Sequence, residues 1–179
     1  MESFVHLLGS LGDALDNGDI DRKDAAVATA QYIAKRMACS RVSVWVLGGE
    51  PGGRVMKRLA AYCAEIGEPI PEETVLTDAE FGRYFDALTS VGVYASDDVR
   101  SDELLKPMWD NHLAPSGICA SLSATIGVNA NTWGVLACSQ CGVPRHWLPQ
   151  EIMLIKRMAN EISLRRARRH AQRLHPSGF

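Results

Sequence analysis

The sequence contains no apolar run long enough to cross a membrane, because its longest uninterrupted apolar runs extend over only several residues. Its first stretch, MESFVHLLGSLGDALDNGD, also lacks the basic region of a secretory signal peptide and carries acidic residues instead. We therefore expect a cytoplasmic protein that does not bind a membrane.

A strong charge of one sign is absent as well. The formal net charge is −2, which provides no general attraction for nucleic acid, and we expect no nucleic-acid partner. The stretch LRRARRHAQR near the C-terminus is nevertheless strongly basic, through Arg165, Arg166, Arg168 and Arg169. We interpret it as the solvated end of a helix, where the negative pole of the helix dipole favours cations.

The patterns of metal, nucleotide and nucleophile sites are missing too. The five histidines are scattered, and none stands at a zinc-ligand spacing with a cysteine. There is no G-x-G-x-x-G after a strand, no Walker lysine and no evident catalytic triad, so we expect neither a metal nor a cofactor. Five cysteines, an odd number without an export signal, indicate reduced thiols rather than a disulfide framework.

The remaining composition is that of an ordinary globular domain, with 46% apolar and 22% charged residues among 179. Helical periodicity predicts a first helix, whose apolar stripe consists of Phe4, Leu7, Leu8, Leu11 and Leu15. Asp21 is expected to cap a second helix that ends near Cys39. Further helices are expected in AEFGRYFDAL, over residues 102–113 (with Pro107 as a possible kink), and from Pro149 to about Arg173.

Strand periodicity appears between these helices. RVSVWVLG and the segment from Arg54 to Cys63 flank the turn GGEPGG and predict a hairpin. GVYAS is expected to be a short strand and EIGEPIPEET a loop, and two longer strands, 118–128 and 133–140, surround the turn NANT. Consecutive strands with helices at both ends of the chain predict an α+β fold with a central antiparallel sheet.

Several of these runs, in order, resemble a GAF domain of the bacterial sensor type over residues 20 to 165. They are RVSVWVL, RYFDAL, Asp97-Asp98, HLAPSGICASLSATI and WGVLACSQCGVPRHWLPQE. The resemblance implies a PAS-like sheet with helices, including the N- and C-terminal ones, packed on one face and a small-molecule pocket over the other. It divides the chain into an N-terminal helix (1–18), a GAF domain (19–165) and a basic C-terminal helix extension (166–179).

The sequence lacks one frequent feature of that family and departs from two of its chemically defined branches. The Glu-His pair that often precedes the G-x-x-R-x-W run is replaced by Ser139 and Gln140. The signature of cyclic-nucleotide-binding members is absent. Bilin-binding members attach their pigment through a cysteine near a histidine, and neither Cys119 nor Cys138 has an adjacent histidine.

Cys138 and Cys141 stand in C-x-x-C spacing, which is compatible with a redox pair or with a purely structural role. Residues three apart on a strand point to opposite faces, and a redox pair usually opens a helix that lowers the thiol pKa. No helix is expected to begin here, so we interpret both cysteines as structural.

The resemblance also predicts a pocket with aromatic walls and a few polar groups. Its expected residues are Ser43, Trp45, Phe81, Tyr84, Phe85, Asp97, Trp109, His112, Ser121 and Ser123. Ser121 and Ser123 share a strand face, as do Ser43 and Trp45. The alternatives stay open that these residues form a plain core and that Asp97 caps the following segment.

The function implied is a non-catalytic regulatory domain that senses a small molecule or nucleotide in signal transduction. The stripe of the first helix and the face of Ile152, Ile155, Ala159 and Ile162 predict a homodimer that passes the signal through its terminal helices. The alternative for these faces is packing within the chain. Two other functions stay open: a free methionine-R-sulfoxide reductase-like enzyme using Cys63 and Cys119, and a structural dimerisation module.

Overall fold

The computed structural model describes residues 3–71, 73–128 and 131–174. Its centre is a seven-stranded antiparallel sheet in the order β3-β2-β1-β7-β6-β5, with β4 paired to β2. The strands are β1 (Arg41–Gly48), β2 (Val55–Cys63), β3 (Glu68–Pro69), β4 (Val75–Thr77), β5 (Val93–Ser96), β6 (Ile118–Val128) and β7 (Asn131–Cys141). The α+β class and the antiparallel sheet predicted from the sequence are thereby confirmed.

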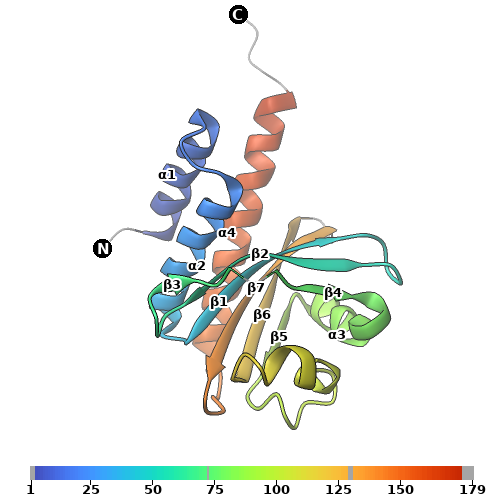
Figure 1. The fold of residues 1–179 in the computed structure, drawn as a ribbon. Helices are drawn as coiled ribbons and strands as arrows, with labels where there is room; N and C mark the ends of the chain where they lie inside the picture. Colours follow the sequence, from blue (N-terminus) through green and yellow to red (C-terminus); the bar gives the residue numbers. More distant parts are fainter. Residues whose placement is uncertain (1–2, 72, 129–130, 175–179) are drawn as a thin grey trace, which may run out of the picture.

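Helices cover both faces of the sheet (Figure 1). On one face lie α1 (Phe4–Asn17), α2 (Arg22–Met37) and α4 (Pro149–Leu174), and on the other α3 (Asp78–Val91) with two short helical turns. The predicted placement of both terminal helices on the same face is confirmed. The helix α4 continues without a break across position 165, where the sequence suggested that the domain ends.

The start of α2 and the bend of α3 are two local features that position these helices. Asp21 begins α2 with a capping box: its carboxylate accepts the Asp24 N–H at 2.8 Å, and the Asp24 carboxylate accepts the Asp21 N–H at 3.2 Å. The predicted cap is confirmed. The helix α3 contains a kink at Phe81, whose backbone is not helical (φ −128°, ψ 19°).

Two segments differ from the expectation. The segment 102–113 is not one α-helix but a 3₁₀ turn at Lys106–Met108 followed by a π turn at Trp109–Leu113. Pro107 lies inside the first turn, and its missing N–H and fixed ring prevent a continuous α-helical ladder. The stretch EIGEPIPEET, which was expected to be all loop, contains β3 and is followed by β4. Strands of two or three residues are too short to show the alternation of apolar and polar residues that identifies a strand. Glu72 and, in the turn NANT, residues 129 and 130 lie outside the described residues.

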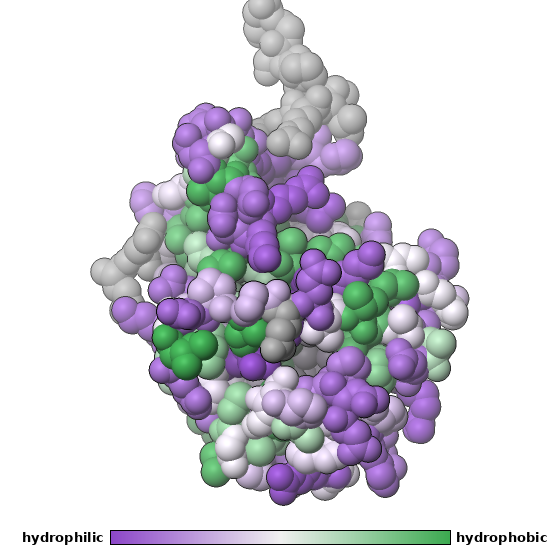
Figure 2. Space-filling model, viewed as in Figure 1, coloured by the Kyte–Doolittle hydropathy of each residue, from purple (hydrophilic) through white to green (hydrophobic). Residues whose placement is uncertain are grey.

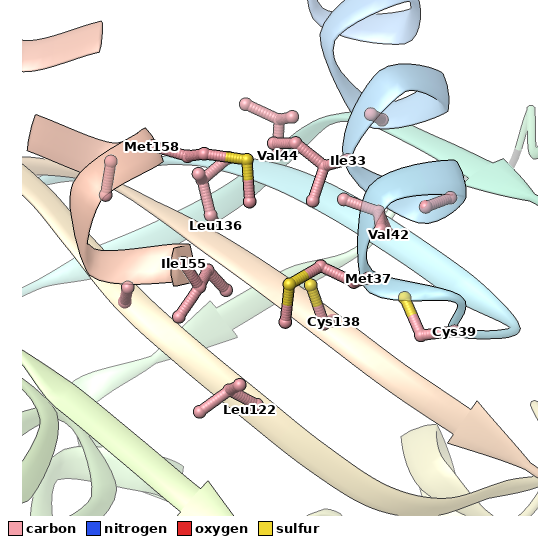
Figure 3. Packing of buried hydrophobic residues seen from close by; sticks show 14 of the residues in the cluster. Ile33, Met37, Cys39, Val42, Val44, Leu122, Leu136, Cys138, Ile155 and Met158 are labelled. Carbon is pink, nitrogen blue, oxygen red and sulfur yellow. The ribbon is translucent and has the colours of Figure 1, made fainter. Parts of the chain in front are cut away.

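The sheet separates two cores. The first, which we call the helix-side core, contains Ile33 of α2, Val42, Leu122 and Leu136 of the sheet, and Ile155 of α4, all essentially inaccessible to solvent (Figure 3). The second, the ligand-side core, contains Leu76, Phe85, Val99 and Met108. Because alternate strand residues contribute to opposite cores, the strands read as long apolar runs interrupted by small polar residues.

The two ends of the chain are joined by arginines of α4 that contact the backbone of α1. Arg165 Nη2 donates to the Val5 carbonyl at 3.1 Å, and Arg169 Nη2 donates to the Gly12 carbonyl at 2.5 Å and pairs with Asp16. A Cβ at Gly12 would collide with the Arg169 guanidinium, so the glycine permits this approach. The expectation of a wholly solvated basic end is therefore corrected: these two side chains hold α1 against α4.

On the face seen in Figure 2, hydrophobic residues form small, separate patches among hydrophilic ones. In the described part of the chain, no helix combines the length and apolar character needed to span a membrane.

Candidate ligand pocket

A cavity of about 220 Å³ lies on the sheet face opposite α2 and α4, beneath α3 and the turns of residues 106–113. Side chains of β1, β6 and β7 form its floor, and those of β2, β4, α3 and the two turns form its walls. This volume is much larger than a packing defect, which seldom exceeds a water molecule, and it can hold one small molecule.

The floor is built from two rows of residues that pair across three neighbouring strands. In one row Ser43 of β1 pairs with Ala137 of β7, which pairs with Ser123 of β6. In the other row Arg41 pairs with Ser139, which pairs with Ser121. We call these six residues the cavity floor. Small side chains in the middle of a sheet leave the volume that bulkier residues would fill.

Tyr84 enters the cavity from α3 and is held by the floor. Its hydroxyl donates to Ser123 Oγ at 3.0 Å, and its ring meets the Tyr94 ring edge-on at 5.4 Å. Burial raises the pKa of Tyr84 to about 12, and the hydrogen bond to Ser123 only partly opposes this. The phenol therefore stays neutral and acts as a polar group of fixed orientation.

The walls carry aromatic and cationic groups. The Arg58 guanidinium lies 5.9 Å from the centre of the Trp45 ring, and the His112 ring meets Phe81 edge-on at 5.6 Å. Among the described residues that line the cavity, none is an aspartate, a glutamate or a cysteine. Arg41 and Arg58 bring cationic groups to this lining.

Six of the ten residues expected at the pocket line this cavity: Ser43, Trp45, Tyr84, His112, Ser121 and Ser123. Phe81 and Phe85 do not; they are buried in the ligand-side core, where Phe85 lies 5.5 Å from the Arg54 guanidinium. Trp109 packs at the edge of the same core, 4.9 Å from Arg100.

Asp97 also lies away from the cavity and organises the loop before α4. Its carboxylate accepts the Trp147 N–H at 3.0 Å and contacts His146 Nδ1 at 2.5 Å. Burial alone would raise the pKa of Asp97, but the bonds from Trp147 and His146 outweigh it and lower the pKa. Asp97 is therefore neither a lining residue of this cavity nor a cap of the segment that follows it in the chain; it fixes a loop 50 residues away.

The sequence reasoning missed Arg41, Arg58 and Ser139 as lining residues. The signal for Arg41 was present, because Arg41, Ser43 and Trp45 alternate along one strand and therefore share a face. Ser139 shares a face with Ala137 by the same parity. Arg58 gave no comparable signal, because a bulge between Val44 and Trp45 shifts the pairing of β1 with β2.

A family model of the GAF domain matches residues 21–165. The chain belongs to the GAF domain family. Solved structures with the same fold include the blue-light absorbing form of the PixJ GAF domain from Thermosynechococcus elongatus. That structure has 22% identity and a TM-score of 0.70, over 92% of this chain and 98% of its own.

Two further structures extend this likeness at lower identity. The phycocyanobilin-bound GAF domain of a cyanobacterial phytochrome has 14% identity and a TM-score of 0.72, over 96% of this chain and 98% of its own. The chromophore-binding domain of a bacteriophytochrome from R. palustris has 14% identity and a TM-score of 0.64, over 90% of this chain and 60% of its own. At such identities the likeness concerns the fold alone. Comparison with curated proteins gives no match.

The G-x-x-R-x-W run of this GAF domain is part of its scaffold. Arg145 donates to the carbonyls of Met37 and Ala38 at 2.9 and 2.8 Å, which caps the end of α2, and pairs with Glu151 of α4 at 2.5 Å. Trp147 is buried and donates from Nε1 to the Ser96 carbonyl at 3.2 Å. The run therefore fastens α2, β5 and α4 together.

The cysteines of the GAF domain lie outside the cavity. Cys138 is buried in the helix-side core (Figure 3), whereas Cys141 is half-buried beside the ligand-side core, so the predicted divergence of the C-x-x-C pair is confirmed. The partner of Cys138 is instead Cys39: their hydrogen bond, followed by burial, raises the pKa of Cys138. Burial likewise raises the pKa of Cys141. In the part of the chain that the structure describes, no group of three or more His, Cys, Asp or Glu residues could hold a metal ion.

Proposed function

We propose that this GAF domain is a non-catalytic sensor that binds a small molecule or nucleotide in the cavity and transmits its presence to the terminal helices. The observation that carries the proposal is the cavity itself, whose floor of serines and arginine replaces apolar packing in the middle of a sheet. A concave site with aromatic walls and a few directed polar groups is the usual setting for a small ligand.

The architecture supports a route from ligand to helices. The strands β6 and β7, which contribute Ser121, Ser123 and Ser139 to the floor, carry on their other face Leu122, Leu136 and Cys138 of the helix-side core. Ile155 of α4 packs in that same core. A ligand that binds one arrangement of the floor and α4 more tightly than another shifts the equilibrium towards that arrangement. The size of the shift is limited by the difference between the two affinities.

A thiol enzyme of the methionine-sulfoxide reductase type is less well supported. Such chemistry needs an activated thiolate facing the substrate, and neither Cys63 nor Cys119 is a lining residue of the cavity. A bilin is also less well supported, because no histidine adjoins Cys119 or Cys138. The phycocyanobilin in the similar cyanobacterial structure is a ligand of that protein and is not evidence for a bilin in this one.

The assembly we propose is a cytoplasmic homodimer through the terminal helices. The α4 face of Ile155 and Ala159 is buried in the chain's own helix-side core, which leaves the partly exposed stripe of α1 as the support for self-association. Sedimentation velocity at tens of micromolar protein tests it. A single species with the mass of one chain would contradict the dimer. A dimer that binds no ligand saturably would instead indicate a purely structural dimerisation module.

Ligand binding is tested by a thermal-shift and heteronuclear NMR screen of metabolites and cyclic nucleotides. A true ligand shifts the resonances of Tyr84, His112 and Ser121. Ser121→Trp fills the cavity and Tyr84→Ala removes a wall, so both should lose binding, while Ser90→Trp on the exposed end of α3 should retain it. If no compound shifts these resonances in the wild type, the sensor proposal fails.

A further inference from the structure

We propose that the ligand of the cavity carries an oxyanion, either a carboxylate or a phosphate monoester, and that Arg41 binds this group. The inference rests on the proposed ligand-binding function and narrows the class of ligand. The structural basis is the distribution of charge around the cavity.

The lining of the cavity is cationic and contains no acid among its described residues. Arg41 and Arg58 both contribute to it. Two buried or partly buried acids on this side of the sheet have partners of their own: Asp102 accepts the Tyr94 hydroxyl at 2.8 Å, and Asp78 is paired with Arg54. A shielded N–H of Arg41 lacks an acceptor in the described part of the chain, and no acid among the described lining residues offers one, so the cavity favours an anion over a neutral or cationic ligand.

Arg41 is placed to receive that anion. It is the first residue of β1 and stands in the cavity floor opposite Ser139. Its Nε is shielded from solvent and has no hydrogen-bond partner among the residues that the structure describes. Buried N–H groups nearly always have an acceptor, and the planar guanidinium matches a carboxylate or phosphate with two parallel hydrogen bonds.

The neighbours of Arg41 provide further donors for the same group. Ser139 and Ser121 lie in its row of the floor, and each hydroxyl can donate to an oxyanion. The other row is different, because Ser123 already accepts the hydroxyl of Tyr84. The oxyanion is therefore expected at the Arg41 end of the floor and the rest of the ligand towards Tyr84 and Trp45.

The size of the cavity restricts the remainder of the ligand. A cavity of about 150 Å³ holds one benzene molecule, and this one measures about 220 Å³. A single ring with an oxyanion substituent fits this space, with the ring against the aromatic faces of Trp45 and Tyr84. An open-chain tetrapyrrole, with its several linked rings, is much larger.

The test uses matched pairs of charged and neutral probes on the full chain. Benzoate is compared with benzamide, and phenyl phosphate with phenol, by calorimetry and by the NMR shifts of Ser121 and Ser139. We expect the charged member of at least one pair to bind about tenfold tighter or more than its neutral partner. The pair that shows this preference distinguishes a carboxylate from a phosphate ligand.

Variants assign the preference to Arg41. Arg41→Gln should abolish the preference for the charged probe. Arg41→Lys keeps the positive charge but loses the planar guanidinium with its two parallel N–H groups, so it should retain part of the preference. Arg157→Gln, an exposed arginine of α4 on the other side of the sheet, is the matched control and should bind as the wild type does. Circular dichroism melting checks the fold, and Ser139→Ala, a milder change in the same row, should weaken the charged probe alone even if Arg41→Gln does not fold.

The outcomes separate this inference from the function on which it rests. Equal affinity for charged and neutral probes, failure of both charged probes to bind, or an undiminished preference in Arg41→Gln and Ser139→Ala would overturn the oxyanion class. In each of these cases a neutral metabolite that shifts Ser121 would still support the sensor. If the metabolite screen also finds nothing, both proposals fail.

Discussion

The guanidinium of Arg54 and the carboxylate of Asp78 form a two-pronged ion pair that is shielded from solvent. Arg54 Nη2 lies 2.6 Å from Oδ1 and Nε lies 2.9 Å from Oδ2, and the two side chains are 8% and 4% exposed. Asp78 also accepts the backbone N–H groups of Gly52 and Arg54, both at 2.7 Å. One carboxylate thus joins the β1–β2 hairpin to the first turn of α3.

Asp78→Asn is expected to lower the free energy of unfolding by about 3 kcal/mol, because it leaves the Arg54 charge buried without its main partner. Urea denaturation at pH 7 measures this loss. Asp86→Asn is the matched control, since Asp86 also contacts Arg54 but its side chain is 71% exposed. It should cost well under 1 kcal/mol. Equal losses in the two variants would contradict the special role of Asp78.

The same pair predicts a specific dependence of stability on pH. The hydrogen bond from Arg54 lowers the pKa of Asp78 in the folded state, although burial opposes it. A lowered pKa contributes stability that is fully present above the unfolded-state pKa of about 3.9 and is lost as pH falls through the folded value. The difference in unfolding free energy between wild type and Asp78→Asn should therefore be constant near neutrality and shrink below about pH 4. A difference that grows on acidification would refute this.

The bond between Tyr84 and Ser123 is expected to stabilise the cavity in the absence of ligand. Tyr84→Phe removes the hydroxyl and should cost about 1 kcal/mol. Ser123→Ala should cost a similar amount, and the double variant should cost less than the sum, because the second change removes a bond already lost. Chemical denaturation of the four proteins gives the coupling energy. Strict additivity would mean that the two hydroxyls do not interact.

Cys138 and Cys141 are expected to be structural. Cys138→Ala should cost on the order of 1 kcal/mol of stability, because it removes a buried thiol from the helix-side core. Cys141→Ala should cost less, since that side chain is only half-buried. Ligand binding should persist in the double variant. A thioredoxin-coupled sulfoxide reductase activity present in the wild type and lost in that variant would reverse the assignment.

Strand parity predicted half of the cavity floor and little of its surroundings. Ser43, Ser121 and Ser123 were found because alternate residues of a strand must share a face, whatever the rest of the fold. Arg41 obeys the same parity, but a charged residue at a strand end looks like a solvated one. The order of strands and helices was likewise readable from periodicity, apart from the very short β3 and β4.

The expected pocket residues that do not line the cavity lie where periodicity has no single answer. Phe81, Tyr84 and Phe85 share an ideal helix face, yet α3 bends at Phe81 and only Tyr84 reaches the cavity. Trp109 and His112 were assigned to one α-helix, but they lie in a π turn after Pro107, and only His112 lines the cavity. The partners of Asp97 are 49 and 50 residues away in the chain, so no local pattern could reveal them.

The contact between α4 and the bare backbone of α1 has a consequence for how the two helices can move. Arg165 and Arg169 bind carbonyl oxygens of Val5 and Gly12, which every residue of a helix offers alike, and only Arg169 adds a contact to a side chain, that of Asp16. Equivalent carbonyls recur one helical turn, about 5.4 Å, along α1. A shift of α1 by one turn would keep carbonyls within reach, but it would break the pair between Arg169 and Asp16 and would need a surface without a Cβ at each guanidinium group. Gly9 and Gly12 are the places where the surface of α1 is bare in this way, and they restrict the helices to the setting in which these glycines face α4.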